Sequence, residues 1–100
     1  MFGLRSKDIE LLIEVLRRYP DVEEAVVFGS RAMGNYKPGS DVDIALKENL
    51  EPDTCGDIAV EFNERMPLPY KFDVIVYQDI SHKPFIEHID CYGKTLYKKS

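Results

Sequence analysis

Residues 26–44 read VVFGSRAMGNYKPGSDVDI, and the rest of the chain is interpreted around this stretch. An apolar run ends at Gly29-Ser30, ten residues follow, and Asp41-Val-Asp43 then opens a second apolar run. The first run, 25–28, is apolar throughout, which is typical of a buried strand. A glycine at its end lets the backbone approach a ligand closely, and Ser30 is a residue type that caps helices. The stretch predicts a strand, a phosphate-holding turn, a short helix and a strand that carries two carboxylates.

The second run places its two acids on one face of the predicted strand. Successive side chains of a strand point to opposite faces, so Asp41 and Asp43 share a face with Ala45, and the large apolar residues between them share the other. A third acid, Asp73, lies inside the apolar stretch 70–77, where an aspartate runs against β-propensity. If these two strands are neighbours, all three carboxylates meet at one end of the sheet.

Three clustered carboxylates predict a metal site. Two unit charges about 4.5 Å apart repel by roughly 4 kcal/mol at an effective dielectric near 20, which divalent cations would relieve. Ligand sets made of oxygen atoms and completed by water and phosphates favour Mg²⁺, and two such ions stabilise both the attacking and the leaving oxygen of a displacement at phosphorus. The turn at Gly29-Ser30 would hold the leaving polyphosphate, and Arg31 could add a fork of charged donors there.

The remaining segments are interpreted as scaffold. A first helix is expected between the cap residue Ser6 and Pro20, because apolar residues recur there at helical spacing. Further on, the sequence predicts a helical stripe containing Ile58 and Phe62, a last helix from Pro84 to Gly93, and a short edge strand at 95–97. His82 and His88 are expected to be structural or exposed to solvent, since they lack metal-ligand spacing with each other or with the acids.

Composition limits the class of protein. The chain of 100 residues is 44% hydrophobic, which predicts one globular domain spanning 1–100. A net charge of −5 argues against binding to nucleic acid through its phosphates. Cys55 and Cys91 lack zinc spacing and are expected to be reduced thiols. With neither a bilayer-spanning run nor a signal peptide in the sequence, a cytoplasmic protein without membrane contact is expected.

The order of these motifs resembles that of a known family. Gly29-Ser30, ten residues, Asp41-x-Asp43 and then Asp73 in an apolar strand resemble the DNA polymerase β-like nucleotidyltransferase superfamily. Within it, the chain is similar to the minimal nucleotidyltransferases (MNT) of prokaryotes, which include antitoxins of the MntA type. The resemblance covers nearly the whole chain and implies an α/β (α+β) fold, with helices packed on a mixed β-sheet. Met33 stands where a basic residue is frequent in the family, and Ile44 where leucine is frequent.

The resemblance also implies roles for these residues. Asp41 and Asp43 would be ligands of both of two Mg²⁺ ions, and Asp73 would bind the ion that activates the attacking hydroxyl. Gly29 and Ser30 would hold the triphosphate of ATP.

By the same resemblance, the chain would be a protein adenylyltransferase. It would transfer AMP from ATP to a tyrosine of a partner HEPN-domain toxin encoded nearby, and so act as the antitoxin of a toxin–antitoxin pair. Two alternatives stay open. The chain could be a catalytically weak binding module that neutralises its partner by contact, or it could transfer nucleotide to a small molecule or to RNA, of which RNA is disfavoured by the acidic charge.

Overall fold

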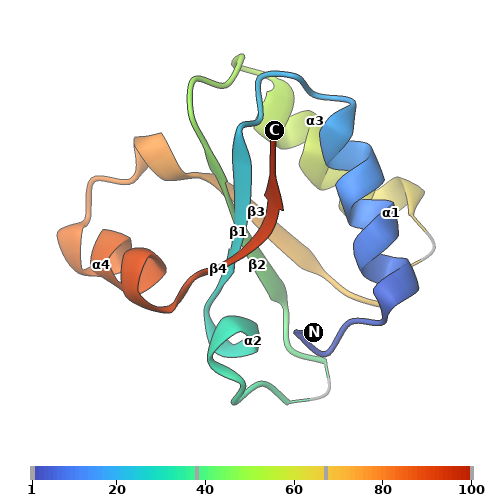
Figure 1. Ribbon diagram of the computed structural model, residues 1–100, viewed down its shortest axis with the longest axis horizontal. Helices are drawn as coiled ribbons and strands as arrows, with labels where there is room; N and C mark the ends of the chain where they lie inside the picture. The colour runs from blue at the N-terminus through green and yellow to red at the C-terminus, as the bar shows by residue number, and fades with distance from the viewer. Residues whose placement is uncertain (1, 38, 67, 100) are drawn as a thin grey trace.

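The computed structural model describes residues 2–37, 39–66 and 68–99, and in these ranges four strands form one sheet with helices on both faces (Figure 1). In chain order the elements are α1 (Ser6–Arg17), β1 (Glu24–Phe28), α2 (Ser30–Met33), β2 (Val42–Lys47), α3 (Thr54–Val60) with the π-helical turn η1 (Glu61–Arg65), β3 (Phe72–Val76), the 3₁₀ turn η2 (Tyr77–Asp79), α4 (Lys83–Tyr92) and β4 (Lys94–Lys98). The expected mixed sheet with packed helices is confirmed. The strand expected over 70–77 is shorter, because Tyr77 already begins η2.

The strand order is β3-β2-β1-β4, and it mixes two kinds of pairing. β1 is antiparallel to both β2 and β4, whereas β2 and β3 are parallel. Parallel neighbours need a crossover connection, which α3 and η1 supply. The parallel register sets Asp43 directly opposite Asp73, and the antiparallel register sets Asp43 opposite Phe28, the residue before Gly29. Three separate segments of the chain are therefore fixed at one end of the sheet.

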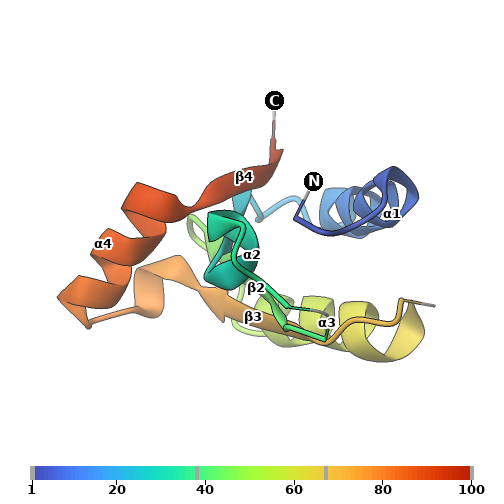
Figure 2. The ribbon, with the colours of Figure 1, turned by 90° about the horizontal axis from the view of Figure 1, so that it is seen from below.

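The two faces of the sheet carry clusters of different size. In Figure 2, α1 and α3 lie on one side of the strands and α4 lies on the other. The larger cluster faces α1 and α3 and includes the alternate residues Val42, Ile44 and Leu46 of β2, all fully buried. The smaller cluster faces α4 and consists of Val26, Phe28, Ala45 and Ile89. Asp43 and Ala45, which alternate with the buried residues of β2, belong to the α4 side.

The start of α1 is capped by Asp8. Its carboxylate accepts hydrogen bonds from the backbone N–H of Arg5 at 3.2 Å and from the Tyr70 hydroxyl at 3.2 Å. Ser6 is instead the first helical residue, so the cap expected of it is wrong. Hydrogen bonds from Arg5 hold the pKa of Asp8 below its ordinary value. The carboxylate of Asp8, the third residue of the helix, therefore satisfies the backbone N–H of Arg5, the residue that precedes the helix.

No helix in the described ranges is both long enough and apolar enough to cross a membrane.

Candidate active site

Asp43 and Asp73 are direct neighbours on the α4 face of the sheet. They are register partners in the parallel pair β2–β3, where adjacent strands lie about 4.8 Å apart. Asp41 comes just before β2 and is exposed, as is Asp73, whereas Asp43 is partly buried. The expectation that the strands carrying these acids are neighbours is confirmed, and the acids do not lie on opposite faces.

The electrostatics of this cluster centre on Asp43. Burial raises the pKa of the Asp43 carboxyl above its ordinary value, and the negative charges of Asp73 and Asp41 raise it further, while His88 acts in the opposite direction. These interactions require all three neighbours to lie within electrostatic range of one carboxylate. The site is therefore a concentration of negative charge that its surroundings only partly compensate.

The donor chemistry of the cluster fits a hard cation such as Mg²⁺, because all three side chains offer carboxylate oxygens. The arrangement is nevertheless not a closed cage: among the residues that the structure describes, no three His, Cys, Asp or Glu side chains are placed so that they could hold a metal ion as they stand. A raised pKa at Asp43 is the behaviour expected of ligands whose charge is not neutralised. The residues present fit the ion in type and neighbourhood.

Gly29 lies against Asp43 at the end of β1. Its φ of +74° is in the region that favours glycine, and a Cβ added to it would lie 2.5 Å from Oδ2 of Asp43. The glycine thus allows the β1–α2 turn to approach the acid cluster. α2 has its first helical residue at Ser30, and Gly29 is the cap position without a side-chain bond, so Ser30 does not cap the helix as expected.

His88 is the residue of this site that the sequence did not reveal. The backbone N–H of Gly29 donates a hydrogen bond to Nε2 of His88 at 3.3 Å. His88 comes from α4, is partly buried, and packs edge-on against Phe28 with ring centroids 6.4 Å apart. Its spacing from the acids along the chain gives no signal, because only the packing of α4 on the sheet brings the ring to the turn.

The donors of Arg31 bind backbone carbonyls. The residue is 5% exposed, and its guanidinium donates to the carbonyl of Ser40 from Nε at 3.1 Å and Nη2 at 2.8 Å, and to the carbonyl of Phe2 from Nη1 at 2.8 Å. It also lies over the rings of Tyr36 and Tyr70, 4.9 and 5.3 Å from their centroids. These contacts occupy the donors of Arg31 in the protein without nucleotide, and a role of Arg31 in phosphate binding stays a prediction. The side chain ties the N-terminal segment to the residue that precedes Asp41.

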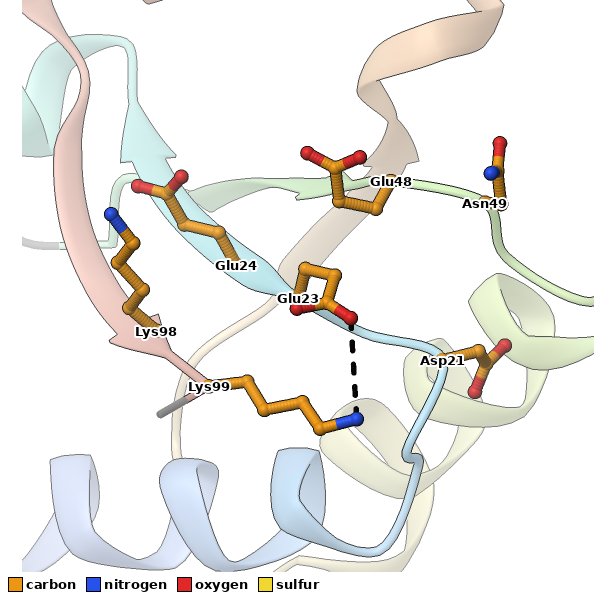
Figure 3. A pocket seen from close by; sticks show the side chains of 7 residues that line it. All are labelled: Asp21, Glu23, Glu24, Glu48, Asn49, Lys98 and Lys99. Atoms are coloured by element: carbon orange, nitrogen blue, oxygen red, sulfur yellow. Dashed lines mark ion pairs between the residues drawn. The ribbon is translucent and has the colours of Figure 1, made fainter.

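A charged hollow of about 470 Å³ lies at the other end of the sheet from the acid cluster (Figure 3). It is lined by Asp21, Glu23, Glu24, Glu48, Asn49, Lys98 and Lys99. Lys99 pairs with Glu23 at 4.0 Å and donates to the carbonyl of Pro20 at 2.8 Å. Because Glu24 opens β1 whereas Gly29 follows its last residue, this hollow is separated from the acid cluster by the length of the strand. Its lysines partly balance its acids, and we assign it no chemistry.

Comparisons with known proteins agree with this fold. The model of the family described as "Polymerase beta, Nucleotidyltransferase" matches residues 10–100. Among solved structures, a chain of a toxin–antitoxin complex with AMP-PNP superposes with a TM-score of 0.71 at 21% identity, over 97% of this chain and 76% of that one. A chain of the complex between the tri-AMPylated HEPN toxin of Shewanella oneidensis and its MNT antitoxin gives 0.70 at 19% identity, over 96% and 74%. A chain of the MntA–HepT toxin–antitoxin gives 0.69 at 19%, over 95% and 74%. No curated protein matches the sequence.

Proposed function

Because the chain belongs to the polymerase beta nucleotidyltransferase family, we propose that it transfers AMP from ATP to a hydroxyl group of a protein partner. The observation that carries this proposal is the register pair of Asp43 and Asp73, set beside the close approach of Gly29 to Asp43. It places a carboxylate cluster beside a glycine turn whose backbone closely approaches one of the acids. Phosphoryl chemistry needs both parts, since catalysis there consists of positioning and charge stabilisation.

In the proposed reaction the acceptor oxygen attacks the α-phosphorus of ATP, the bond to the β-phosphate oxygen breaks, and pyrophosphate leaves as the hydroxyl proton passes to water. Asp41 and Asp43 would hold two Mg²⁺ ions, with Asp73 completing the ligands on the acceptor side. When bound, the ions would neutralise charge on the phosphates and lower the pKa of the attacking hydroxyl. Gly29 and Ser30 would hold the triphosphate, so that the leaving pyrophosphate is oriented away from the acceptor.

We further propose a HEPN-domain toxin encoded nearby as the partner and a tyrosine as the acceptor. Support comes from the similar fold of an MNT antitoxin whose HEPN toxin carries AMP groups. The net charge of −5 favours a protein or small acceptor over RNA. The chain would then act as an antitoxin by modifying its partner in the cytoplasm.

The test uses ATP labelled at either the α- or the γ-phosphate, with Mg²⁺ and the neighbouring HEPN protein. The expected result is label on the partner from α-labelled ATP only, and its loss in the double variant Asp41→Asn/Asp43→Asn. Asp53→Asn, an exposed acid at the start of α3, is the matched control and should keep full transfer. Label from γ-labelled ATP, or undiminished transfer by the double variant, would refute the proposal.

The same double variant separates catalysis from simple contact. If the chain neutralises its partner by modification, toxicity returns when the variant is co-expressed with the toxin. If neutralisation persists without transfer of AMP, the chain is a binding module and the acid cluster is not needed for its biological effect.

A further inference from the structure

The hydrogen bond between Gly29 and His88 joins the two sides of the proposed nucleotide site. The N–H of Gly29 donates to Nε2 of His88 at 3.3 Å. A backbone amide carries one hydrogen and serves one acceptor well at a time. If Gly29 donates to a phosphate oxygen, as the proposed function has it, that oxygen must take the place that the imidazole nitrogen now holds.

The imidazole is held in this place by packing on both sides. Its ring lies edge-on to Phe28, and it is tilted by 45° against Tyr92, with centroids 5.4 Å apart. α4 itself is anchored on the sheet by Ile89, which is 2% exposed, and by Phe85, whose ring meets Phe28 at 5.5 Å. The ring is therefore presented to the turn by a packed helix.

The same position lies close to the acid cluster. A Cβ on Gly29 would lie 2.5 Å from Oδ2 of Asp43, so the glycine stands between the carboxylate and the imidazole. A phosphate chain running along this turn would pass the imidazole on its way to the acids. The His88 side chain is itself only partly buried, and its neighbour Tyr92 is 49% exposed.

We propose that His88 occupies the position of a phosphate oxygen on the Gly29 amide in the nucleotide-free protein, and that the triphosphate of ATP binds by displacing it. This inference rests on the proposed function, since it needs Gly29 to be a phosphate donor. His88 is then a residue that weakens ATP binding, because each binding event must first break the bond between the imidazole and the amide. A ring nitrogen that accepts from an N–H carries no hydrogen of its own, so Nε2 of His88 and a phosphate oxygen compete for the same donor.

The test compares the dissociation constant for ATP with Mg²⁺ across variants, measured by calorimetry without an acceptor. His88→Phe keeps a ring between Phe28 and Tyr92 but cannot accept the hydrogen bond, and His88→Ala removes both. Both are expected to bind ATP about two- to tenfold more tightly, the equivalent of one net hydrogen bond. His82→Ala, at the exposed start of the same helix, should bind like the wild type.

The outcomes separate this inference from the proposed function. Unchanged or weaker binding by both His88 variants, while the wild type binds ATP, would overturn the role of His88 and leave the nucleotidyltransferase intact. Absence of ATP binding by all four proteins would overturn both. As a second measurement, adding ATP should shift the ¹⁵N signal of Nε2 of His88 toward that of a ring without this bond. An Nε2 signal that ATP leaves in place would contradict the displacement.

Discussion

Replacing Arg31 by alanine tests whether this side chain is a structural tie or a phosphate ligand. The guanidinium makes three hydrogen bonds to two backbone carbonyls, those of Ser40 and Phe2, and the residue is 5% exposed. Removing it leaves both carbonyls without these donors and frees the N-terminal segment from the loop before Asp41. The variant should therefore lose folding stability even with no ligand present.

The size of the effect follows from these contacts. Hydrogen bonds to charged donors contribute about 1.5–3 kcal/mol each, and each of the two tyrosine rings adds about 0.5–1 kcal/mol. The cost of burying the guanidinium offsets part of that sum. We expect Arg31→Ala to reduce the free energy of unfolding by about 3 kcal/mol. At about 4–8 °C per kcal/mol for a domain of this size, the melting temperature should fall by roughly 15 °C.

Urea unfolding followed by circular dichroism measures this loss directly. Arg31→Lys should fall between wild type and Arg31→Ala, because an ammonium group keeps the charge but cannot reproduce the planar fork. Arg17→Ala, at an exposed position of α1, is the control and should change stability by less than about 0.5 kcal/mol. If Arg31→Ala unfolds like the wild type yet loses ATP binding, the side chain is a phosphate ligand after all and our reasoning is wrong.

Three further changes test the site and its scaffold. Because folding raises the pKa of Asp43, the ionised carboxylate makes the folded protein less stable at pH values above the ordinary carboxyl pKa. Asp43→Asn should therefore raise the melting temperature of the EDTA-treated protein at pH 7 and give no gain at pH 3, where the carboxyl is protonated in both states. The opposite holds for Asp8, whose lowered pKa gives stability that is present at neutral pH and is lost as the pH falls through that value. Asp8→Asn should therefore be less stable than wild type at pH 7, with the difference closing in acid, and a pH-independent difference would contradict this. Gly29→Ala should cost about 1–3 kcal/mol, because φ +74° with ψ −153° is a conformation that essentially only glycine adopts, and the clash with Asp43 adds to this cost. It should also abolish the rise in melting temperature that Mg²⁺ with ATP is expected to give the wild type, and an alanine variant that still responds to ATP would show that the close approach is dispensable.

The strands and the acid pair could be predicted from the sequence because both depend on local alternation. The period of two in 41–46 placed Asp43 opposite the large core, and an acid inside an apolar strand marked Asp73. The alternation alone does not predict the register between β2 and β3, which are connected through α3 and η1. That Asp43 and Asp73 are direct partners needed the structure.

The roles of Arg31 and His88 could not be predicted, because they depend on contacts between distant segments. The Arg31 guanidinium donates to the carbonyls of Phe2 and Ser40, and no sequence pattern near Arg31 predicts these two contacts. His88 reaches Gly29 across 59 positions of sequence, through the docking of a whole helix. A charged residue beside a glycine turn is therefore weak evidence of a phosphate ligand when backbone carbonyls lie within its reach.

The unequal clusters on the two faces of the sheet have a consequence for local opening. α4 rests on the smaller cluster through Ile89 and Phe85, while the central strands are fixed by the larger one behind them. Segments of a folded protein can open separately, and the segments with the least buried apolar surface open at the lowest free energy. Amide hydrogens of α4 should thus exchange with deuterium sooner than those of β1 and β2, through excursions that leave the strands paired. Such excursions would carry the imidazole away from the turn without unfolding the protein.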